Sequence, residues 1–76
     1  MNNTRRKSLE EIRARMEDIK ADIEMLRDEE QEYIDSMPES LQSGEKHETA
    51  ENAVTNMDEA INALEDIISN IDEATT

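Results

Sequence analysis

Residues 36–44 read Ser-Met-Pro-Glu-Ser-Leu-Gln-Ser-Gly and contain the only proline and the only glycine of the 76-residue chain. Pro38 disfavours the α conformation at Met37, so a helix that precedes it is expected to end near Asp35 or Ser36. Proline is favoured at the first position of a helix and glycine just past its end, so Pro38 and Gly44 are placed to flank one helical turn. The stretch predicts a break between two helices, with a turn over residues 37–44.

Before the turn, apolar residues recur in alternating steps of three and four, the spacing of a coiled-coil seam, with one polar member. The seam consists of Leu9, Ile12, Met16, Ile19, Ile23, Leu26, Glu30, Tyr33 and Met37. Ser8 and Glu11 form a capping-box pattern. We therefore expect a helix over about residues 8–36, preceded by a flexible basic arm at residues 1–7.

After the turn, a second seam predicts a helix over about residues 45–74. Its members are Ala50, Ala53, Met57, Ala60, Leu64, Ile67, Ile71 and Ala74. Two helices of similar length with a short link form an antiparallel hairpin. Seam residues whose numbers sum to 83, such as Ile19 and Leu64, pair without a slip as far as Tyr33. The predicted fold is all-α, a single coiled-coil-like helical hairpin over residues 1–76.

Val54, Ile61 and Ile68 form a third apolar column on the second helix. Two seam columns suffice for a pair of helices, so this column widens the apolar stripe to the kind found in bundles. It has two explanations. It can be the contact surface of a homodimer that makes a four-helix bundle, or the aliphatic stems of Arg13, Lys20 and Arg27 can cover it in a monomer. We expect the homodimer, because a lone hairpin of this size is marginally stable.

Charge is distributed unevenly along the chain. The net charge is −13, and residues 28–76 contain 15 acidic residues but one basic residue. On the first helix, Arg13, Lys20 and Arg27 each follow a glutamate by three residues, so local ion pairs are expected there. The second helix has two acidic columns without such compensation. They are formed by Glu51, Asp58, Glu59, Glu65, Asp66, Asp72 and Glu73.

These acidic columns have two interpretations. They can be a solvated surface, or they can bind a basic protein partner by resembling a nucleic-acid backbone. The lack of compensating charge favours the second, because uncompensated charge destabilises a folded chain by self-repulsion. The net charge disfavours direct binding to nucleic acid.

The residue types exclude several kinds of chemistry. The chain has no cysteine, one histidine (His47) and one glycine, so it has neither a thiolate metal site nor a glycine-rich phosphate loop. Residue 44 is glycine, so the Glu-x-x-His spacing of di-iron bundles is absent at His47. We expect no catalytic, cofactor-binding or metal-binding residues. No apolar run exceeds two residues, so a membrane span is not expected. We expect a cytoplasmic location.

The stretch Asp28-Glu29-Glu30-Gln31-Glu32-Tyr33-Ile34-Asp35-Ser36-Met37-Pro38-Glu39-Ser40-Leu41-Gln42-Ser43 resembles the central motif of small acidic helical proteins of phages, prophages and Firmicutes genomes. The resemblance implies a phage or mobile-element origin, in which small acidic proteins often block a host protein. The motif also spans the turn, where Leu41 is expected to close the end of the hairpin. The predicted function is therefore inhibition or modulation of a basic host or phage protein. The alternative is a structural module that acts only by homo-oligomerisation.

Overall fold

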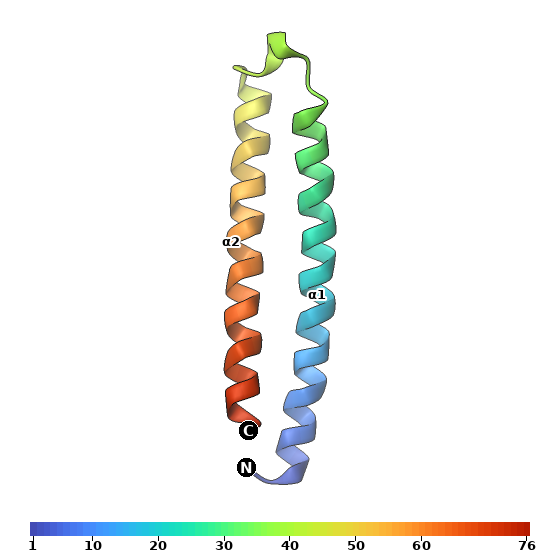
Figure 1. The fold of residues 1–76 in the computed structure, drawn as a ribbon, viewed down its shortest axis with the longest axis vertical. Helices are drawn as coiled ribbons and strands as arrows, with labels where there is room; N and C mark the ends of the chain where they lie inside the picture. Colours follow the sequence, from blue (N-terminus) through green and yellow to red (C-terminus); the bar gives the residue numbers. More distant parts are fainter.

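The computed structural model describes residues 1–76 and contains two long antiparallel helices (Figure 1). Helix α1 spans Asn3–Asp35, the short 3-10 helix η1 spans Glu39–Leu41, and α2 spans Glu45–Ala74. Both termini lie at one end of the molecule and the link lies at the other, so the predicted all-helical hairpin is confirmed. The molecule measures 59 × 14 × 13 Å between its outermost Cα positions. It is a thin rod in which each helix has only the other to pack against.

Helix α1 begins at Asn3, five residues earlier than expected from the capping-box pattern. Oδ1 of Asn2 accepts a hydrogen bond from the backbone N–H of Arg5 at 2.8 Å, which is the contact of an N-cap residue. The Ser8 hydroxyl donates to the carbonyl of Thr4 at 3.1 Å, as serine does inside a helix. Residues 1–7 are therefore mostly helical and do not form a flexible arm. Asparagine caps a helix as well as serine does, and the earlier cap adds more than one turn.

The link is ordered by backbone hydrogen bonds around Pro38. Helix α1 ends at Asp35, as the proline predicts, and the N–H of Leu41 then donates to the carbonyl of Pro38 at 2.8 Å. The N–H of Gly44 donates to the carbonyl of Leu41 at 3.1 Å, directly before α2 begins. Leu41 is exposed, whereas Met37 is buried. The side chain that fills the closed end of the hairpin is therefore Met37, not Leu41.

The interior is small and lies along the interface of the two helices. Five residues are buried, and all are apolar: Ile34, Met37, Ala50, Val54 and Ile68. Ile34, Ala50 and Val54 form one cluster near the closed end. No charged or polar side chain is buried.

The burial pattern shows that α2 is rotated relative to the predicted seam. Val54 and Ile68 are 7% and 6% exposed, and Ile61 is half-buried between them. The alternative column, Ala53, Ala60, Ile67 and Ala74, is more exposed. The observed rotation points the three larger β-branched side chains at α1 instead of a column that is mostly alanine, which buries more apolar area. The predicted interface of a dimer, Val54, Ile61 and Ile68, is thus the inside of the hairpin.

Candidate functional site: two unlike faces of the hairpin

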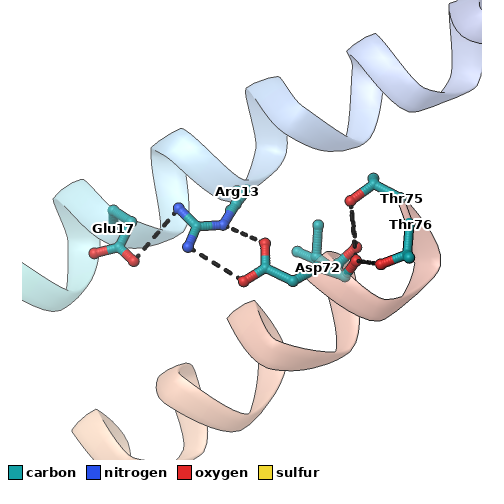
Figure 2. Close-up of polar contacts among 6 residues, drawn as sticks. Arg13, Glu17, Asp72, Thr75 and Thr76 are labelled. Atoms are coloured by element: carbon teal, nitrogen blue, oxygen red, sulfur yellow. Dashed lines mark hydrogen bonds and ion pairs between the residues drawn. The ribbon is translucent and has the colours of Figure 1, made fainter.

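One face of the hairpin is crossed by a ladder of contacts from α1 to α2, which we call the ladder. Nε of Arg13 donates to Oδ1 of Asp72 at 2.6 Å, and Nη2 of the same guanidinium donates to Oδ2 at 3.3 Å (Figure 2). Lys20 Nζ lies 3.3 Å from Glu65 Oε1. Arg27 Nε lies 2.9 Å from Asp58 Oδ1. The three pairs follow one another by seven residues on each helix, so they repeat at every second turn.

A fourth contact extends the ladder to the open end. Nε of Arg6 donates to the carbonyl of Thr75 at 3.2 Å, just past the end of α2. The hydroxyls of Thr75 and Thr76 donate to the carbonyl of Asp72 at 3.2 and 2.8 Å (Figure 2). These contacts satisfy carbonyls that the end of a helix leaves without intrahelical partners.

The ladder shifts the titration of its basic members. The pKa values of Arg13, Lys20 and Arg27 are raised above their ordinary values, first by the hydrogen bonds to Asp72, Glu65 and Asp58 respectively. The ladder side chains retain substantial solvent contact, and exposed ion pairs of this kind stabilise only weakly. Their larger effect is on register, because a slip of α2 by one turn would separate all three pairs.

The basic column of α1 is therefore compensated mainly by α2, not by the preceding glutamates of its own helix. The one glutamate of α1 in an ion pair with this column is Glu17, which follows Arg13 by four residues at 3.6 Å. Within α1, Nη1 of Arg27 also lies 3.4 Å from Oδ1 of Asp28. The acidic column of α2, however, adjoins the basic column along the whole rod and pairs with Arg13, Lys20 and Arg27 alike.

The ladder also divides the predicted acidic surface in two. Asp58, Glu65 and Asp72 belong to the ladder, and Glu51 pairs with Nδ1 of His47 at 3.0 Å when that histidine is protonated. The remaining three residues, Glu59, Asp66 and Glu73, lie on the outer side of α2, exposed and without an ion pair. We call these three the outer acidic column. One of the two predicted columns is thus partly neutralised within the hairpin.

The opposite face of the hairpin is apolar and open. On each helix it is formed by the column that flanks the buried seam on the side away from the ladder. These columns are Ile12, Ile19, Leu26 and Tyr33 on α1, and Ala53, Ala60, Ile67 and Ala74 on α2. We call this set the apolar face. Four of its large side chains, those of Ile19, Leu26, Tyr33 and Ile67, are 43–52% exposed.

Near the link, the apolar face is hollowed. An open groove of about 480 Å³ runs between the helices, with Glu30 and Tyr33 on one wall and Ala50 and Ala53 on the other. Its lining places the α1 column and the α2 column on the same side of the molecule. A second hollow of about 390 Å³ adjoins it around Met37, Pro38 and Leu41. Exposed apolar side chains therefore extend from the apolar face to Leu41 at the closed end.

The border of the apolar face on α2 carries no charge. The residues four positions before each α2 member are Thr49, Asn56, Ala63 and Asn70, all exposed. On α1 the corresponding border consists of Ser8, Arg15, Asp22 and Glu29. The apolar face thus has an uncharged border on α2 and a border of mixed charge on α1, and Glu30 and Glu45 line its groove near the link. The seven-residue spacing of these columns is evident in the sequence. The seam prediction, however, places the residues of the apolar face inside the hairpin.

No group of three or more His, Asp or Glu side chains is arranged to hold a metal ion. Neither helix has a segment long and apolar enough to cross a membrane. Comparison with protein families, curated proteins and solved structures found no match to this chain. The two faces of the hairpin are thus the features from which its function is inferred.

Proposed function

We propose that this protein is a non-enzymatic protein-binding module that presents its outer acidic column to a basic protein partner. The observation that carries the proposal is the division of charge across α2. Asp58, Glu65 and Asp72 have counter-charges inside the hairpin, whereas Glu59, Asp66 and Glu73 have none. Such a surface speeds encounter with a basic protein.

The resemblance of residues 28–43 to a motif of phage and prophage proteins supports a partner of one kind. It would be a basic host or phage protein, such as a nucleic-acid-handling or defence enzyme, which the module inhibits or modulates. Imitation of a nucleic-acid backbone is limited by spacing. Residues seven apart on a helix are about 10.5 Å apart along the axis, whereas one DNA strand carries a phosphate every 3.4 Å or so. The mimicry is of sign and linear arrangement, not of charge density.

Two matched variants test this function. The outer variant combines Glu59→Gln, Asp66→Asn and Glu73→Gln, and the ladder variant combines Asp58→Asn, Glu65→Gln and Asp72→Asn. Each removes three negative charges from the same helix. A basic protein captured from a host lysate is purified and titrated with wild type and both variants by surface plasmon resonance.

We expect the outer variant to weaken binding by about tenfold, mostly through a slower on-rate, because peripheral charges act on encounter. The ladder variant should bind more nearly as wild type does once its folding is verified by circular dichroism. Equal loss in both variants would show that net charge alone matters. Unchanged binding by the outer variant would contradict the proposal, as would failure of duplex DNA to compete if the partner binds nucleic acid.

A second candidate function is assembly by homo-oligomerisation, with a homodimeric four-helix bundle as the product. The apolar face favours it, because apolar columns that repeat every seven residues along both helices are typical of bundle interiors. The two functions use different surfaces, so one molecule can perform both.

A further inference from the structure

The apolar face is unusual for so small a protein because it is continuous along the rod. Its α1 column repeats every seven residues from Ile12 to Tyr33, and its α2 column does so from Ala53 to Ala74. Only five of 76 residues are buried in the hairpin itself. Seven large apolar side chains are at least 43% exposed, four of them on this face, and extended exposed apolar patches mark interaction sites.

The size of the face suits a second copy of the chain. A helix of 30 residues is about 45 Å long, and two adjacent helices are about 20 Å wide, so the face covers roughly 900 Å². A stable protein–protein interface buries about 800 Å² on each partner. Two hairpins in contact along this face would reach that size, and each would gain the core that it lacks alone.

The charges around the face point to the same occupant. A basic partner would be selected by carboxylates, but the α2 border of the face, Thr49, Asn56, Ala63 and Asn70, is uncharged. Carboxylates line the face only in the groove near the link, where Glu30 and Glu45 lie with Lys46. The ladder lies on the opposite side, and the outer acidic column lies away from the seam. Two copies with a charge of −13 each can approach along this face while keeping most of their like charges apart.

Side-chain volume distinguishes the two ways in which the faces can meet. The α1 column has large side chains, including Leu26 and Tyr33, whereas three of the four α2 members are alanine. If the twofold axis runs along the rod, each α1 lies on the α2 of the other copy, and large residues meet small ones. If the axis runs across the rod, α1 lies on α1, and large residues meet large ones. Close packing favours the first arrangement.

The same arrangement also suits the borders. It brings the mixed-charge border of α1, with Arg15, Asp22 and Glu29, against the uncharged border of α2. If the twofold axis runs across the rod, the charged border of α1 would instead face the same border of the other copy. The first arrangement places every neighbouring pair of helices antiparallel and brings the two links to the same end.

We propose that a second copy of this chain covers the apolar face, α1 on α2, to form a four-helix bundle with both links at one end. This inference rests on the second candidate function and assigns its surface and geometry. It replaces Val54, Ile61 and Ile68, which face the inside of the hairpin, by Ile19, Leu26, Tyr33 and Ile67.

Two adjacent residues provide a matched test of the surface. Leu26 and Met25 are 52% and 56% exposed, but Leu26 belongs to the apolar face and Met25 lies on the outer side of α1. Wild type, Leu26→Asp and Met25→Asp are measured by sedimentation velocity from 1 to 200 µM, ~0.15 M salt. We expect a dimer for wild type and Met25→Asp. Leu26→Asp should raise the dimer dissociation constant about 100-fold or more, because the twofold axis places the change in the interface twice.

Ile67→Gln serves as a second variant, and circular dichroism verifies that each variant remains helical. The geometry is measured on the variant Ser43→Cys, whose link carries a single spin label because the chain has no other cysteine. Links at the same end place the labels within about 30 Å, since the bundle is two helices wide in each direction. Links at opposite ends place them near the 59 Å length of the rod.

A wild-type chain that stays monomeric to 200 µM would overturn the proposal, and so would a Leu26→Asp variant that dimerises as wild type does. A label distance near the rod length would overturn the same-end arrangement. Failure of the acidic-surface function is distinguishable, because the outer variant leaves the apolar face intact. That variant should bind the partner more weakly while its dimer persists or strengthens.

Discussion

Ile67 and Ile68 are neighbours in the chain but lie on opposite sides of the boundary between the core and the apolar face. Ile68 is 6% exposed and packs inside the hairpin, whereas Ile67 is 43% exposed. A rotation of one residue, about 100° on a helix, separates these environments. The orientation of α2 that turns Ile68 toward α1 also places Asp58, Glu65 and Asp72 beside the basic column of α1.

The two isoleucines predict different costs for the same substitution. Ile68→Ala should lower the free energy of unfolding by about 2–5 kcal/mol, the range for truncating a buried isoleucine to alanine. Ile67→Ala should cost under about 1 kcal/mol at concentrations where the chain is monomeric, because the side chain is partly solvated already. Urea denaturation of both variants, at a concentration about tenfold below the dimer dissociation constant so that the chain is mostly monomeric, measures the difference. Equal costs would contradict the observed rotation of α2.

The beginning of α1 is expected to depend on Asn2. Asn2→Ala removes the acceptor for the N–H of Arg5 and should destabilise the first turn by about 0.5–2 kcal/mol. Ser8→Ala is the matched control, because Ser8 makes only a bond to the carbonyl of Thr4 within the helix. Amide hydrogen exchange should accelerate at residues 5–8 in Asn2→Ala alone. Faster exchange in Ser8→Ala would return the helix start to Ser8.

Lys20 predicts a loss of stability at high pH. Its pKa is raised in the folded chain, first by the hydrogen bond to Glu65, so folding favours the protonated amine. Its contribution is therefore complete below the ordinary value of 10.5 and is lost as pH rises through the higher folded-state pKa. Lys20→Arg should retain the ion pair at these pH values, because a guanidinium stays protonated. Thermal melts at pH 9 and 11.5 should show a smaller drop for Lys20→Arg than for wild type, and equal drops would exclude a contribution from the Lys20–Glu65 pair.

Salt should affect the two proposed interactions in opposite directions. Raising NaCl from about 0.05 to 0.5 M shortens the range of charge interactions to a few ångströms. The dimer should strengthen several-fold, because repulsion between two copies of charge −13 is screened. Binding of a basic partner should weaken, because its attraction is screened as well. Sedimentation and surface plasmon resonance at the same salt concentrations measure both, and a dimer that weakens with salt would point to an interface held by ion pairs.

Several features of this protein follow from the sequence by itself. Pro38 ends α1 at the expected place because it excludes the α conformation from the residue before it. The apolar residues at three- and four-residue steps produce two helices of nearly equal length, and a short link makes them antiparallel. These constraints act between residues close in the chain, so they can be predicted from the sequence.

Only the tertiary structure decided which side of α2 faces α1. Helix α2 has three adjacent apolar columns, and a pair of helices needs only two of them. The choice depends on the partner helix: Val54, Ile61 and Ile68 fill the interface better than alanines do, and the same rotation aligns the ladder. Both the packing of the interface and the alignment of the ladder depend on the two helices together, so neither can be predicted from one helix alone. The sequence therefore contained the apolar face and the acidic columns, but the packing of one helix on the other decided which of them remain exposed.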